Sequence, residues 1–209
     1  MASSLIHLAI GALLRDEVTD FHRFSLGEVM PDAGCGAHHS AHMPKIICGG
    51  AKETFDLTLF CEEFSSELLS DDLYLGYYLH LVQDMIHREA VYKKHGFDPR
   101  KPGYLDALYA DYRALNPYLV RKYSLTMPDI PDTLDISLMA RYDFDLPALR
   151  GRIADNFADC AEGDGTVFTR EIADSIIEDS VALCRREIDA LRRGGSVIDE
   201  DSLAWERKK

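Results

Sequence analysis

The sequence predicts an all-α fold, a single-domain helical bundle, and three observations support this prediction. Apolar residues recur at helical spacing along most of the chain, whereas no run shows the alternation of a strand. The 209 residues are enough to bury one substantial core. No internal repeat or linker composition divides the chain. We therefore expect one domain over residues 1–195, followed by a polar, frayed C-terminal tail over 196–209.

The expected helices follow from apolar spacing and from residues that begin or end helices. Ser3 or Ser4 can cap a first helix, which ends near Leu14. Further helices are predicted over about 57–68, from Asp71 or Asp72 to about 95, after Pro102 with a restart or kink at Asn116–Pro117, and over about 146–160 and 169–193. The stretches 27–50 and 125–145 are expected to be connecting segments, because both are rich in residues that interrupt helices.

The charge balance narrows the possible functions. Acidic residues number 36 and basic residues 23, so the formal net charge is −13. We therefore expect no general nucleic-acid binding, which depends on Lys and Arg at phosphates. A metal site stays compatible with this composition, because its cations can attract an anionic substrate.

The N-terminal apolar stretch, Leu5 to Leu14, is too short to cross a bilayer. It lacks a basic preceding region and is followed by charged residues, so it does not resemble a signal peptide. The five cysteines form no C-x-x-C pair, and their odd number favours reduced thiols. We expect a cytoplasmic protein without a transmembrane segment.

Histidine is the residue type whose placement is most informative. The eight histidines are His7, His22, His38, His39, His42, His80, His87 and His95. All of them precede residue 96, which random placement would produce in about one of 500 chains. The first half of the chain therefore has a use for imidazole.

His80 and Asp84 form the sharpest local signal. They lie four residues apart in the segment LGYYLHLVQD, so on a helix they project from the same face. An imidazole and a carboxylate at this spacing can bind one divalent ion. The surrounding residues are apolar, and a buried Asp without a cation or donors would be costly. The alternative is an ordinary His–Asp hydrogen bond or a solvated face.

Two further signals lie upstream. His7 interrupts an otherwise apolar helix, where it is either a ligand or a hydrogen-bonded core residue. Asp32 follows a proline and precedes a glycine-rich turn, and His38, His39 and His42 lie within ten residues of it. Nitrogen and oxygen ligands from a loop and two helices suit a site for one or two zinc ions.

The segments SSLIHLAIGALL, LGEVMPD, SAHM and DDLYLGYYLHLVQDMI resemble, in the same order, the bacterial zinc-dependent phospholipase C family. The superfamily of these enzymes also includes fungal single-strand-specific nucleases. The resemblance covers about residues 1–95, and its most specific parts are the GE…PD turn and the GYxxHxxxD helix. It implies an all-α fold, zinc as the metal and phosphodiester hydrolysis as the chemistry.

The resemblance also implies a set of metal ligands. The positions that match the family's motifs are His7, Asp32, His42, His80 and Asp84. Four of them would hold one zinc, and Asp84 would also reach a second zinc that it shares with His7. His39 is the alternative to His42, because the loop is shorter here than in the secreted enzymes.

The chain departs from the family in three places. It begins Met1-Ala2, where the secreted enzymes have a mature N-terminal Trp that binds zinc. Ala90 stands where the family has a further His ligand, and no histidine follows His95. These differences favour a site for one or two zinc ions over the family's site for three.

The expected function is that of a zinc-dependent hydrolase with a small phosphoester substrate, either a phosphodiester or a phospholipid-like molecule. The alternative is a catalytically inactive metal-binding helical protein of the same fold. A di-iron oxidase would need paired Glu-x-x-His motifs, which the sequence lacks. A purely structural helical adaptor would need no metal at all.

Overall fold

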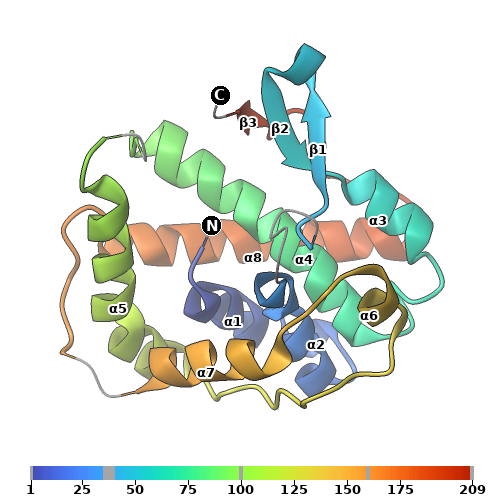
Figure 1. Cartoon of the computed structure of the whole chain (residues 1–209), viewed down its shortest axis with the longest axis horizontal. Coiled ribbons are helices and arrows are strands. Elements are labelled where there is room, and N and C mark those ends of the chain that lie inside the picture. Colours follow the sequence, from blue (N-terminus) through green and yellow to red (C-terminus); the bar gives the residue numbers. More distant parts are fainter. Residues whose placement is uncertain (1, 35–40, 99–100, 159–160, 208–209) are drawn as a thin grey trace.

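The computed structural model describes residues 2–34, 41–98, 101–158 and 161–207 (Figure 1). The helices are α1 (Ser4–Leu13), α2 (Phe21–Gly27), α3 (Leu57–Glu63), α4 (Asp72–Arg88), α5 (Tyr104–Tyr123), α6 (Ser137–Arg141), α7 (Leu146–Phe157) and α8 (Arg170–Arg192). Short 3₁₀ turns cover Arg15–Glu17, Met30–Ala33 and Cys48–Gly50, and α4 continues into a π-helical turn over Glu89–Lys94. The molecule is mostly helical, as the sequence predicts.

Several helices begin at the caps that the sequence suggests. The side chain of Asp71 accepts a hydrogen bond from the Leu73 N–H, and Thr169 does the same for Ile172. The helix expected to restart or kink near Pro117 is one continuous element, α5, with the proline inside it. The short helices α2 and α6 lie in regions where the sequence does not predict helices.

A small antiparallel sheet is the main departure from an all-α fold. Its strand order is β1 (Pro44–Ile47), β2 (Lys52–Phe55), β3 (Trp205–Glu206). The first two strands have four residues each and the third has two, too few for a visible alternating pattern. In Figure 1 this sheet projects from the helical body at the top of the view.

Residues 196–207, part of the expected polar tail, pack onto the rest of the protein instead of fraying. Lys45 and Glu200 form an ion pair, with 2.7 Å between Nζ and Oε1. The other carboxylate oxygen of Glu200 accepts a hydrogen bond from the Thr58 N–H, and β3 then pairs with β2. The boundary expected at residue 195 is therefore not the end of the folded unit.

Helix α4 crosses the middle of the molecule, where it contacts α1, α2 and α8 (Figure 1). Two glycines let α2 and α4 approach closely. A Cβ added to Gly27 would lie 2.1 Å from the Leu73 carbonyl oxygen, and one added to Gly76 would lie 2.3 Å from the Phe24 carbonyl oxygen. Any side chain at either position would force the backbones apart. This contact fixes the turn after α2 beside the part of α4 that carries His80.

In the parts of the chain that the structure describes, no helix has the combination of length and apolar character needed to cross a bilayer.

Candidate metal centre

Five of the residues suggested by the sequence meet at one place in the fold. They form two overlapping groups that can each hold a metal ion, His7–His80–Asp84 and Asp32–His42–His80. In each group the potential ligand atoms lie within 4.8 Å of one another. The sixth candidate, His39, lies outside the described residues.

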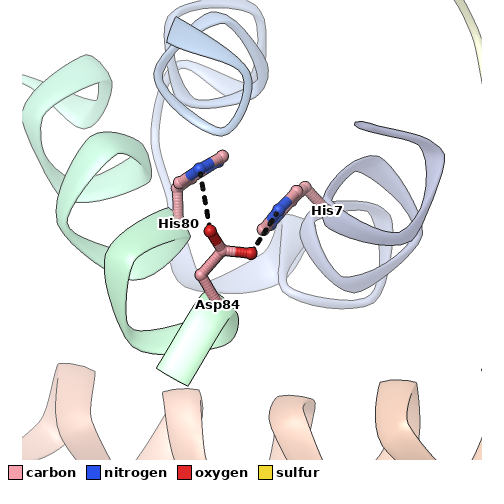
Figure 2. Close-up of side chains that lie close together, drawn as sticks. All are labelled: His7, His80 and Asp84. Atoms are coloured by element: carbon pink, nitrogen blue, oxygen red, sulfur yellow. Dashed lines mark ion pairs between the residues drawn. The ribbon is translucent and has the colours of Figure 1, made fainter. Parts of the chain in front are cut away.

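These side chains come from separate parts of the chain. Helix α1 supplies His7, and α4 supplies His80 and Asp84 (Figure 2). The 3₁₀ turn after α2 supplies Asp32, and the segment before β1 supplies His42. The site is thus assembled by tertiary packing around α4, whose His80 and Asp84 lie one turn apart.

Four ligand atoms surround a space of the size of a zinc ion. The Nε2 atoms of His42 and His80 are 3.3 Å apart, and His42 Nε2 lies 3.6 Å from Asp32 Oδ1 and 3.8 Å from Asp84 Oδ2. His80 Nε2 lies 4.0 Å from each of the same two oxygens. Ligands about 2.0–2.2 Å from a tetrahedral zinc would be about 3.3–3.6 Å from one another. A small inward movement of these side chains would complete that geometry.

The two carboxylate oxygens of Asp84 face different histidines. Asp84 Oδ1 lies 3.5 Å from His7 Nε2 and accepts a hydrogen bond from the Ala2 N–H (2.7 Å), while Oδ2 faces His80 and His42. Figure 2 shows this carboxylate between His7 and His80. The arrangement is that of a carboxylate able to bridge two metal ions. Among the described residues, only His80 and Asp84 group with His7 as candidate ligands, so a second ion beside His7 would keep open positions.

Hydrogen bonds fix which nitrogen of each imidazole faces the centre. Gln83 donates its amide N–H to Glu28 Oε1 (2.9 Å), so its oxygen accepts from His7 Nδ1 (2.8 Å). His80 Nδ1 donates to the main-chain carbonyl of Glu28 (2.8 Å). Both histidines therefore present the lone pair of Nε2 to the centre, the form in which imidazole binds metals.

Two buried polar atoms of the centre have no hydrogen-bond partner among the described residues. They are His7 Nε2 and Asp84 Oδ2. Unpaired buried polar atoms are rare, because each loses its hydration without compensation. Both atoms point toward the space between the candidate ligands, where a cation would satisfy them.

The electrostatic environment keeps these groups in the form that a metal needs. Burial alone would raise the pKa of Asp84, but its contact with His7 holds that pKa well below the usual value. Burial opposes ionisation of Asp32 too, yet its contact with His42 and the nearby imidazoles lower the pKa of this carboxyl. Burial lowers the pKa of His80 to about 3. The carboxylates are thus ionised and His80 is neutral at neutral pH.

Sequence reasoning missed three residues that support the ligands. Glu28 and Gln83 are buried and connect His7 to His80 through the hydrogen bonds described above. Tyr77 donates its hydroxyl hydrogen bond to the Ala41 carbonyl, which holds the segment that carries His42. Glu28 and Gln83 are polar residues beside predicted ligands in otherwise apolar surroundings, and this is the signal that could have found them.

The C-terminal segment also reaches the centre through aromatic contacts. The Trp205 ring packs edge-on against Phe55, with 5.0 Å between centroids, and the centroid of Phe55 lies 5.5 Å from that of the His42 ring. The guanidinium carbon of Arg88 lies 4.1 Å from the centroid of the Trp205 ring. His42 is therefore supported by a strand residue that is itself held by residue 205.

Comparison with known proteins finds no family model, no curated protein and no solved structure that matches this chain. A metal centre is therefore inferred from the contacts of these side chains.

Proposed function

We propose that this protein is a zinc-dependent hydrolase of phosphoesters, either phosphodiesters or phospholipid-like molecules, that works through one or two zinc ions. The observation that carries the proposal is the spacing of Asp32 Oδ1, His42 Nε2, His80 Nε2 and Asp84 Oδ2, whose separations given above are 3.3–4.0 Å. The unpaired buried atoms of His7 and Asp84 support it.

The donor set fits zinc. Two neutral imidazoles and two carboxylates in a compact, near-tetrahedral arrangement are ligands that zinc accepts. The resemblance of the first 95 residues to zinc-dependent phospholipases C favours zinc over manganese or iron, which accept similar donors.

In this mechanism the chain positions the reactants and moves one proton. Bound zinc would supply stabilisation of the phosphoryl oxygens and a water acidic enough to act as a nucleophile near neutral pH. Asp32 Oδ1 faces both His42 and His80, which leaves Oδ2 to accept the proton of the attacking water. The water oxygen bonds to phosphorus, the P–O bond to the leaving alcohol breaks, and the alcohol oxygen takes up a proton.

A catalytically inactive metal-binding protein of the same fold is the second candidate. It is favoured by the few ligands around His7 in the described residues and by the absence of any histidine after His95 in the sequence. Such a protein would bind one zinc at the four-ligand set and would turn over no phosphoester.

Elemental analysis and a diesterase assay test the proposal. Protein purified without a histidine tag should contain one to two zinc ions per chain and should cleave bis(p-nitrophenyl) phosphate. Asp84→Asn should lose most of the zinc and at least about 100-fold of the activity, because it removes the shared carboxylate. His22→Ala is the matched control, since His22 is exposed on α2 and should change neither result.

Each other outcome has a defined meaning. Zinc without turnover of a broad phosphoester panel supports the inactive metal-binding protein. The absence of bound zinc, and failure to bind added zinc, would contradict both candidates.

A further inference from the structure

The candidate centre opens to solvent at Asp32. The Asp32 side chain is 17% exposed and that of His42 is 7% exposed, whereas the side chains of His7, His80 and Asp84 are fully buried. An anionic substrate can therefore reach the centre from the side of Asp32.

Arg152 lies at this opening. Its Nη2 donates a hydrogen bond to the main-chain carbonyl of Asp32 at 2.6 Å. The turn that carries Asp32 is itself fixed against the start of α7, because the Asp145 N–H donates to the Ala33 carbonyl (2.9 Å). The guanidinium group is thus held beside a candidate ligand while the Arg152 side chain stays exposed.

The charge of Arg152 is not neutralised by a nearby carboxylate. Within the described residues Arg152 forms no ion pair, whereas Arg150 on the same helix pairs with Asp132, and Arg141 pairs with Glu63. The chain has a net charge of −13, so an unpaired cation next to a carboxylate-rich centre is unusual. One hydrogen bond to Asp32 leaves most of the five guanidinium N–H donors available.

We propose that Arg152 is a substrate-binding residue that holds the non-bridging oxygens of the phosphoryl group at the mouth of the centre. The inference rests on the proposed phosphoesterase function and adds a residue from the second half of the chain to the site. Arginine suits this role, since its planar fork binds two phosphate oxygens at once and keeps its charge at any physiological pH. It would also offset the repulsion that the acidic protein exerts on an anionic substrate.

Binding of inorganic phosphate to the zinc-loaded protein tests this inference without requiring turnover. Isothermal titration should give a Kd about 10-fold or more higher for Arg152→Gln than for the unmodified protein, because a charge-assisted contact is lost. Arg152→Lys should fall between the two, since it keeps the charge but not the fork. Arg150→Gln is the matched control and should bind phosphate like the unmodified protein. Zinc content is measured for every variant.

Three results would overturn the inference. They are unchanged phosphate binding in Arg152→Gln, equal weakening in Arg150→Gln, and loss of zinc from Arg152→Gln, which would mean that Arg152 only braces the Asp32 turn. The diesterase assay separates this inference from the proposed function. If phosphate binding depends on Arg152 but no diester is cleaved, the anion site stands and the hydrolase does not.

Discussion

Glu28 is a buried carboxyl group whose second oxygen, Oε2, has no hydrogen-bond partner in the part of the chain that the structure describes. Burial raises its pKa to about 8, although the nearby His7 opposes this shift. Between the ordinary carboxyl pKa of about 4.5 and this value the folded state holds a proton that the unfolded state has lost. The contribution of Glu28 to stability is therefore present below pH 4.5 and is lost as pH rises toward 8.

The variant Glu28→Gln removes this titration while keeping an oxygen that can accept from Gln83. In metal-free protein, we expect Glu28→Gln to gain stability relative to the unmodified chain between about pH 5 and about pH 8.5, by on the order of 1–3 kcal/mol. Urea unfolding at the two pH values measures the difference. A free-energy difference independent of pH would mean that Glu28 is not protonated in the folded state.

Some residues of the centre can be read from the sequence and others cannot. His80 and Asp84 share a helix face because they are four residues apart, and the concentration of histidines in the first half indicates that His7 and His42 have a common purpose. Glu28 and Gln83 belong to no repeating pattern. Their importance depends on the hydrogen bond that joins them across 55 positions, which only the folded chain brings together.

At the scale of elements, the contact between α2 and α4 determines whether the ligands meet. Gly27 and Gly76 belong to the two segments that resemble the phospholipase family most closely, and they touch each other's helices. Their place in those segments is explained by this contact, because no larger residue fits there. The Arg23–Asp71 ion pair adds a second tie between the same helices, with 2.7 Å between Nε and Oδ1.

Replacing Gly76 with Ala should therefore damage the centre as well as the fold. An added Cβ would meet the Phe24 carbonyl oxygen at 2.3 Å, so we expect a loss of about 3 kcal/mol or more in unfolding free energy and weaker zinc binding. Gly151→Ala on α7 is the matched control. Its Cβ would meet nothing within 4 Å among the described residues, and the change should stabilise the helix by up to about 1 kcal/mol. Chemical unfolding and zinc content measure both effects; equal behaviour of the two variants would contradict this account.

Element prediction succeeds where helices are long and capped, and it fails where elements are short. Helices α4, α7 and α8 have clear caps and apolar faces. The strands have two to four residues, and α2 has only seven, so none of them gives a strong periodic signal. The ion pair of Lys45 with Glu200 joins residues 155 positions apart, and local patterns carry no information about such a contact.

At the scale of the whole molecule, metal binding should contribute to global stability, since the candidate ligands join α1, α4 and two loops. We expect removal of zinc with EDTA to lower the melting temperature by about 5–10 °C. The Asp84→Asn variant should show little change on the same treatment. Differential scanning calorimetry measures both, and an unchanged melting temperature for the unmodified protein would mean that these residues are not held together by zinc.

The contact of Trp205 with Phe55, and of Phe55 with His42, has a consequence for biosynthesis. All five candidate ligands have been synthesised by residue 84, but the aromatic support of His42 exists only once residue 205 has been made. A nascent chain therefore carries every donor atom long before the pocket around them is rigid, so the tightest hold on the metal is gained after synthesis rather than during it.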